Sequence, residues 1–80
     1  MRVPRDLTGQ ELIRRLEKLG YAVTRQAGSH VRLTTQVGGE HHVTVPNHDP
    51  LRIGTLAAIL GAVAAHGGMT RDELLARLFD

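Results

Sequence analysis

The spacing of the hydrophobic residues changes twice along this 80-residue chain, and these changes constrain its fold more than any other feature. Before Gly20, leucine and isoleucine recur at helical intervals. After it, three segments alternate hydrophobic and polar residues, as strands do, and beyond Pro50 the helical interval returns. The alternating segments are 21–26, 30–37 and 41–46. The pattern predicts an α+β fold in the order α-β-β-β-α, with a short extra helix at the end of the chain.

Two short motifs indicate where the first and last helices begin. The segments "TGQE" from Thr8 and "TRDE" from Thr70 both have the form of a capping box, and an apolar residue stands on either side of each. They predict a helix over about 9–19, closed by Gly20, and another over about 71–79. The first helix is expected to bury Leu12, Ile13, Leu16 and Leu19 and to turn Arg14, Arg15 and Lys18 toward solvent.

The longest helix is predicted to begin at Asp49, as N-cap, with Pro50 in its first turn. Gly67 and Gly68 are expected to end it. Its buried stripe, with spacings of three and four, is Ile53, Leu56, Ile59, Leu60 and Val63.

Glycine pairs divide the alternating region into three antiparallel strands. Gly28-Ser29 and Gly38-Gly39 supply turn residues that tolerate a positive φ, so two short hairpins are expected. Alternation then assigns the faces of the second and third strands. Val31, Leu33, Val43 and Val45 should point into the core, and His30, Arg32, Thr34, His42 and Thr44 should share the opposite face.

Composition narrows the class of protein. The length suits one domain over residues 1–80, with a core region of about 7–67. No cysteine is present, which excludes disulfides and Cys-based zinc sites and favours the reducing cytoplasm. No apolar run reaches the roughly 18 residues of a membrane span, so no membrane association is expected. Residues 1–56 hold eight Lys and Arg against five Asp and Glu, a basic balance that suits a nucleic-acid partner.

His30 is the residue that most invites a chemical interpretation. It follows a Gly-Ser bend and shares a face with Arg32. The pattern alone leaves two readings open, a solvated strand residue or a proton-transfer group. An imidazole, with an ordinary pKa of about 6.5, moves protons in both directions near neutral pH. Beside an arginine it would suit RNA cleavage by 2′-hydroxyl attack, in which the guanidinium offsets charge on phosphorus.

The other histidines do not form a convincing metal site. His41 and His42 are neighbours on one strand and therefore point to opposite faces, and His48 lies in a loop. No metal ion or other cofactor is therefore expected. His66 is expected to interact with the carbonyl groups at the end of its own helix.

Several further residues are candidates for contact with phosphates. Gly54 and Thr55, with Arg52 beside them, stand near a helix start, where backbone N–H groups bind anions. Close packing of Gly54 against the sheet is an equally open explanation of that glycine. Arg15 is best explained by an i,i+4 pair with Glu11. The candidate RNA-contacting residues are Lys18, Arg25, Gly28, Ser29, Arg32, Arg52, Gly54 and Thr55.

The combination of these motifs resembles the HicA family of toxin ribonucleases. The resemblance is carried by "LIRRLEKLGY", "RQAGSHVRL" and "VTVPNHDPLRIGTLAAIL" and covers nearly the whole chain. It implies a fold similar to the double-stranded-RNA-binding domain, with both long helices on one sheet face. It also implies metal-independent cleavage of messenger RNA by one essential histidine, which matches His30, and a HicB-type antitoxin that covers it. Val31 and Ile53 depart from the family, which often has His and Lys there.

The leading hypothesis is therefore a toxin of a toxin–antitoxin pair that acts as an endoribonuclease. His30 would be the general acid or base and Arg32 would assist. The alternative is a non-catalytic RNA-binding module of the same fold, and a third is a protein that only assembles with a partner. The chain is expected to be a monomer when free and a hetero-oligomer with its antitoxin.

Overall fold

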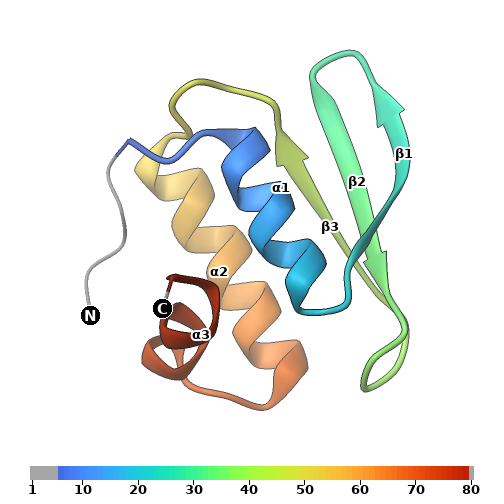
Figure 1. Ribbon diagram of the computed structural model, residues 1–80, viewed down its shortest axis with the longest axis vertical. Helices are drawn as coiled ribbons and strands as arrows, with labels where there is room; N and C mark the ends of the chain where they lie inside the picture. The colour runs from blue at the N-terminus through green and yellow to red at the C-terminus, as the bar shows by residue number, and fades with distance from the viewer. Residues whose placement is uncertain (1–5, 80) are drawn as a thin grey trace.

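A three-stranded antiparallel sheet and three helices make up the computed structural model, which describes residues 6–79 (Figure 1). The ends of the expected domain, 1–5 and 80, lie outside the described residues. The elements are α1 (Gly9–Lys18), β1 (Ala22–Ala27), β2 (His30–Thr35), β3 (His41–Pro46), α2 (Ile53–Gly67) and α3 (Arg71–Phe79). The predicted order and the α+β class are confirmed, and the strands are arranged β1-β2-β3 with a hairpin between each pair.

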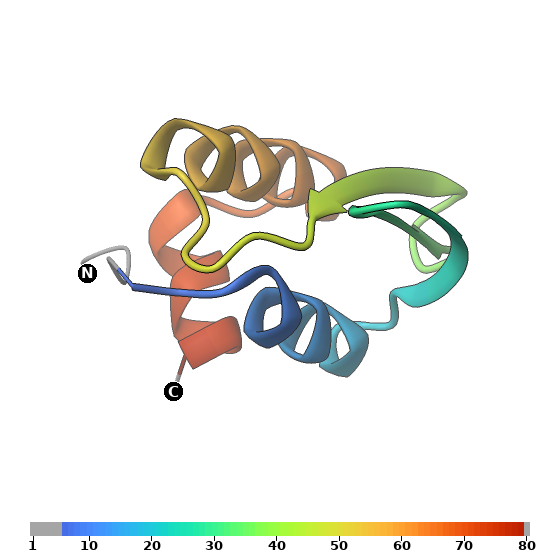
Figure 2. The same ribbon diagram turned by 90° about the horizontal axis from the view of Figure 1, so that it is seen from above.

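The helices cover one face of β2 and β3 and leave the other open, whereas β1, at the edge of the sheet, is exposed along its whole length. Along β2 and β3, buried and exposed residues alternate as predicted, so the core-facing side chains are Val31, Leu33, Val43 and Val45. α1 and α2 pack on this side, and α3 packs on both helices away from the strands (Figure 2). Leu12, Leu16, Leu56, Leu60, Leu74 and Leu75 are almost fully buried between the layers. Across residues 6–79 no single helix is long and apolar enough for a membrane span; α2 and α3 meet that test only as a pair bent by 103°.

The start of α1 is fixed both locally and by the loop after β3. Thr8 and Glu11 form the predicted capping box, with bonds of 3.0 and 3.1 Å between side chain and backbone. The N–H of Gly9 donates to the carbonyl of His48 at 2.9 Å. A Cβ at Gly9 would collide with the carbonyl oxygen of Pro46, so the close approach of these two backbones requires glycine.

The start of α2 was predicted wrongly. The helix begins at Ile53 with Arg52 as N-cap, not at Asp49, and Asp49-Pro50 lies before it in the connecting loop. The reason is Leu51, whose side chain is 2 % exposed and whose N–H donates to the carbonyl of Leu7 at 2.8 Å. This tertiary bond takes Leu51 out of the helix and buries it in the core. Ile53, expected in the buried stripe, is 59 % exposed.

Arg15 was predicted to point into solvent, but its side chain contacts the end of α3. Its Nη1 donates to the carbonyl of Leu78 at 2.7 Å, and its guanidinium lies 4.7 Å from the centre of the Phe79 ring. The side chain therefore satisfies an otherwise unpaired carbonyl at the end of α3 and stacks on its last aromatic residue. Together with the three buried leucines of α3, this contact makes the last helix part of the core.

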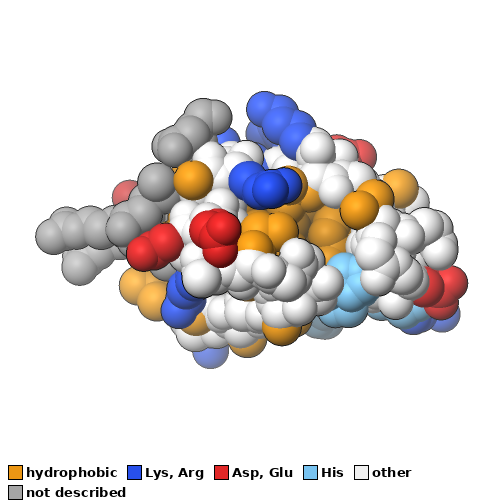
Figure 3. All heavy atoms as spheres, turned by 90° about the horizontal axis from the view of Figure 1, so that it is seen from below, with side chains coloured by type: hydrophobic (Ala, Val, Ile, Leu, Met, Phe, Trp, Pro, Cys, Tyr) orange, Lys and Arg blue, Asp and Glu red, His pale blue; other side chains and the backbone are white. Residues whose placement is uncertain are grey.

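The histidine at the end of α2 also has a different partner from the one predicted. His66 donates from Nε2 to the carbonyl of Val37, in the β2–β3 hairpin, at 2.9 Å. Its ring stacks on that of His41 with centroids 4.4 Å apart, and His41 Nδ1 is hydrogen-bonded to the Tyr21 hydroxyl at 2.8 Å. These contacts tie the hairpin to α2 and to the start of β1. Figure 3 shows this end of the molecule, where histidine side chains lie beside a hollow with hydrophobic side chains in it.

The histidine stack predicts a loss of stability in weak acid. Burial, with His66 and His42 nearby, holds the pKa of His41 below its ordinary value. The unfolded chain then binds a proton near pH 6.5 that the folded chain does not. Stability is full above that pH and falls as the pH drops below it. We expect His41→Gln to reduce this fall between pH 7 and 5, measured by urea unfolding; an unchanged slope would show that His41 does not cause it.

Candidate functional site

The β1–β2 turn presents His30 at the edge of the open face. Gly28, with a φ of 59°, and Ser29 form a two-residue turn closed by the pair Ala27 and His30. The carbonyl of Ser29 accepts a 2.6 Å hydrogen bond from the N–H of Asn47, which anchors the turn to the loop after β3. The His30 side chain is exposed, and among residues 6–79 it has no hydrogen-bond or ionic partner. Its ring is thus held by a firm backbone and available to a ligand.

A β-bulge in β1 brings Arg25 to the same face as His30. Val23 pairs with Leu33 and lies on the same side of the sheet as Leu33, although at this edge strand it is 44 % exposed. The register shifts before Arg25, which pairs with Arg32. Directly paired residues in an antiparallel sheet point to the same side, so Arg25 and Arg32 both lie on the open face. Residues paired across the strands form a row of the open face. Arg25 and Arg32 make up the row next to that of His30, about 7 Å away along the strand. Without the bulge, simple alternation would have placed Arg25 on the side of Val23.

The two guanidiniums form no salt bridge within the described residues. Like charges placed directly opposite each other in a sheet are unfavourable. Within the described residues, neither Arg25 nor Arg32 has a carboxylate at salt-bridge distance. The pair therefore forms an anion-attracting row beside the imidazole.

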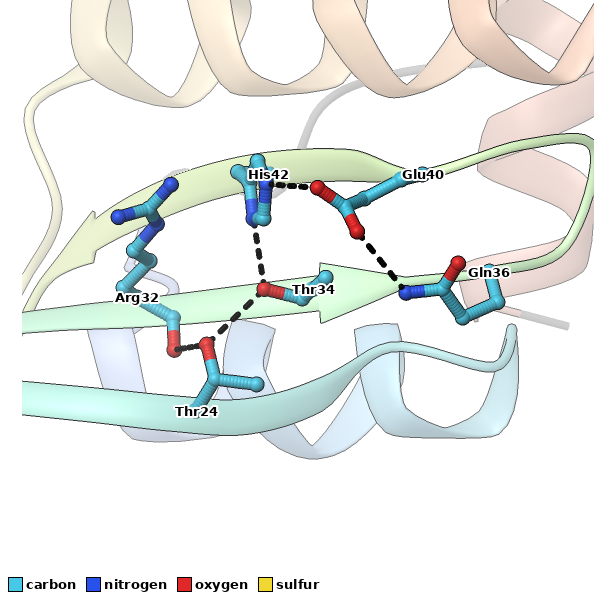
Figure 4. Close-up of polar contacts among 6 residues, drawn as sticks. All are labelled: Thr24, Arg32, Thr34, Gln36, Glu40 and His42. Carbon is cyan, nitrogen blue, oxygen red and sulfur yellow. Dashed lines mark hydrogen bonds and ion pairs between the residues drawn. The ribbon is translucent and has the colours of Figure 1, made fainter.

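A chain of hydrogen bonds occupies the next row (Figure 4). His42 donates from Nε2 to Glu40 at 3.0 Å, and its Nδ1 lies 2.7 Å from the hydroxyl of Thr34, which in turn is 2.9 Å from that of Thr24. Hydrogen bonds from Gln36 and His42, and the charge of Arg32, hold the pKa of Glu40 below its usual value. The carboxylate therefore stays ionised and fixes the orientation of the His42 ring.

The open face can consequently do three things at successive rows. The first row offers a proton-transfer group, the second offers two positive charges, and the third offers an oriented imidazole. The β1–β2 hairpin brings together five of the candidates from the sequence: Arg25, Gly28, Ser29, His30 and Arg32. The third row was not recognised from the sequence, where Thr34 and His42 were placed on the right face but given no role.

The remaining candidates lie elsewhere. The first residue of α1, Gly9, packs beside the His48 backbone, and the helix is about 15 Å long. Lys18, at the other end of α1, therefore lies at the opposite end of the domain from His30 (Figure 1). Arg52, Gly54 and Thr55 lie at the start of α2, at the same end as His30 but in the helix layer. A Cβ at Gly54 would meet nothing within 4 Å, so packing does not explain this glycine.

The histidines do not converge on a metal site in the described part of the chain. Within residues 6–79, no group of three or more His, Asp or Glu side chains is placed to hold a metal ion. His41 and His42 lie on opposite faces of β3, as predicted, and His48 is exposed in the loop that leads to α2.

The fold and the open polar face define an α+β domain like the double-stranded-RNA-binding domain. Residues 9–64 match the family described as the HicA toxin of bacterial toxin–antitoxin systems, and the chain belongs to this family. No curated protein and no solved structure gave a match. The family assignment makes the chain the toxin of a toxin–antitoxin pair, and α3 lies beyond the matched residues.

Proposed function

We propose that this toxin is a metal-independent endoribonuclease that cleaves messenger RNA through His30. The observation that carries the proposal is the exposed His30 imidazole, without a protein partner in the described residues, one row from two guanidiniums that form no salt bridge there. Membership of a toxin family, together with an imidazole beside two guanidiniums, favours cleavage of RNA, a polyanion whose own 2′-hydroxyl is the nucleophile.

The reaction uses only groups that the RNA and this site provide. The 2′-hydroxyl oxygen attacks the adjacent phosphorus while His30 takes its proton, and the bond from phosphorus to the 5′-oxygen breaks. The departing 5′-oxygen receives the proton that His30 has accepted, which returns the imidazole to its neutral form and leaves a 2′,3′-cyclic phosphate and a 5′-hydroxyl. Arg32, with Arg25 opposite it, offsets the charge that develops on the phosphoryl oxygens. Ser29 and Gly28 place the ring, and Lys18, Arg52, Gly54 and Thr55 would contact more distant parts of the message.

The partner that restrains this activity is, in our proposal, a HicB-type antitoxin that covers His30. Acidic groups on such a protein would complement the Arg25–Arg32 row. The exposed large hydrophobic residues Val23, Val37 and Ile53 are scattered over different elements, which favours a monomer in the absence of the antitoxin. We place the complex in the cytoplasm, where messenger RNA is present and a cysteine-free chain needs no oxidation.

The test is cleavage of a purified messenger RNA in the presence of EDTA. We expect fragments with 5′-hydroxyl ends and cyclic phosphates at the other end, and the same rate when magnesium is added. Cleavage that requires a divalent metal would overturn the mechanism. Binding of RNA without any cleavage would instead support the non-catalytic RNA-binding module.

A further inference from the structure

We infer that the open face of the sheet binds single-stranded RNA, with phosphates on the Arg25–Arg32 row and one unpaired base stacked on the ring of His42. The inference rests on the proposed function for its ligand class, RNA. It adds the path of the strand, its single-stranded form and a base-binding residue. Nothing in the catalytic step requires His42.

The arginine row indicates where the backbone of the ligand lies. Arg25 and Arg32 are direct partners across β1 and β2, and in the described part of the chain no carboxylate pairs with either. A phosphodiester between them would replace a repulsion by two charge-assisted bonds. His30 lies two residues before Arg32 on β2, on the same face. The next phosphate of the same RNA strand would therefore reach the imidazole.

The His42 ring is prepared to receive a base on its flat side. Both ring nitrogens are already engaged, Nε2 by Glu40 and Nδ1 by Thr34, so the ring cannot rotate freely and offers no further in-plane contact. The side chain is nonetheless 37 % exposed. In Figure 4, Arg32 and His42 lie beside each other over β2 and β3, with Glu40 on the far side of the ring. Histidine is among the side chains on which unpaired bases stack.

The order of the rows favours a single strand over a duplex. His30 and Arg32 follow one another on β2, and His42, on β3, pairs with Thr34 in the next row. The rows rise by about 7 Å each, comparable with successive nucleotides of an extended strand. A base can reach the His42 face only when it is unstacked and unpaired. In an A-form duplex the bases are enclosed, and side chains do not enter the deep major groove.

Binding of short oligonucleotides tests the inference without depending on cleavage. The probe is a 12-nucleotide, fully 2′-O-methylated RNA, which lacks the attacking hydroxyl, used alone and as a blunt duplex. We expect the single strand to bind more tightly than the duplex. Arg25→Gln and Arg32→Gln should each weaken binding and reduce the slope of log affinity against log salt by about 0.7. Arg71→Gln, the same charge change on α3, should leave both unchanged.

His42 is tested by its stacking rather than by its charge. His42→Ala should weaken binding of the single strand by about 5- to 150-fold with little change in the salt slope, and His42→Phe should restore most of the affinity. Preference for the duplex, or normal affinity of His42→Ala, would overturn the inference. Cleavage of unmodified RNA by the wild type is measured separately. A failure of the ribonuclease proposal is thereby distinguished from a failure of this one.

Discussion

The His30→Ala variant is expected to cleave messenger RNA at least about 100-fold more slowly than the wild type, and up to about 10⁴-fold. General acid–base catalysis contributes that range, and alanine cannot transfer a proton. The fold should not change, because the ring is exposed and makes no hydrogen bond within residues 6–79. Substitutions at such surface positions usually alter the free energy of unfolding by less than about 0.5 kcal/mol.

The measurement is the initial rate of cleavage in EDTA, together with the thermal midpoint of each variant. Thr44→Ala, which removes an exposed side chain from the same face, is the matched control and should keep most of the activity. Induced expression in bacteria should arrest growth with the wild type and the control, but not with His30→Ala. A wild-type rate in the alanine variant would remove His30 from the mechanism.

The features predicted correctly from the sequence are those set by neighbouring residues. A capping box needs only a threonine and a glutamate three residues later, and both predicted boxes are formed. Alternation along β2 and β3 likewise gave the correct faces for Val31 and Val45, because the period of a strand is fixed by its backbone. The exposure of His30 followed from the same argument.

The errors arise where distant parts of the chain meet. Arg15 contacts Leu78, 63 residues away, and no local pattern indicates that partner. Leu51 leaves α2 because it bonds to Leu7, which overrides the helix-start signal of Asp49 and Pro50. Glycine and proline signals describe what the backbone can adopt locally, whereas these positions are decided by the core.

The candidate site shows the same division. His30 was found from a motif, but the position of Arg25 depends on a bulge that alternation does not reveal. The threonine in the bulge, Thr24, is a weak signal on its own, because many regular strands contain threonine. Glu40, in the β2–β3 connection, orients His42 on β3. This contact could not be predicted without the register of the hairpin.

The Gly9→Ala variant is expected to lose about 1 to 3 kcal/mol of stability, although alanine is ordinarily the better helix former. The new methyl group would collide with the Pro46 carbonyl oxygen and lie 3.0 Å from Asn47 Cα, and both contacts are backbone atoms that cannot rotate away. Overpacking of this kind costs more than the gain in helix propensity, which is about 1 kcal/mol or less. In a domain of this size the loss corresponds to a fall in Tm of roughly 5 to 20 °C.

The Gly61→Ala variant makes the same chemical change but is expected to change the stability of the domain in the opposite direction. Gly61 lies within α2 and is exposed, and a methyl group added there would meet no atom within 4 Å, so alanine should stabilise the domain by about 0.5 to 1 kcal/mol. Urea unfolding of both variants measures the two values. The Gly9 variant should also cleave RNA more slowly, because moving Asn47 strains its bond to Ser29, beside His30. Equal stabilisation by both substitutions would show that α1 can move away from the loop after β3, and that this contact does not hold the β1–β2 turn.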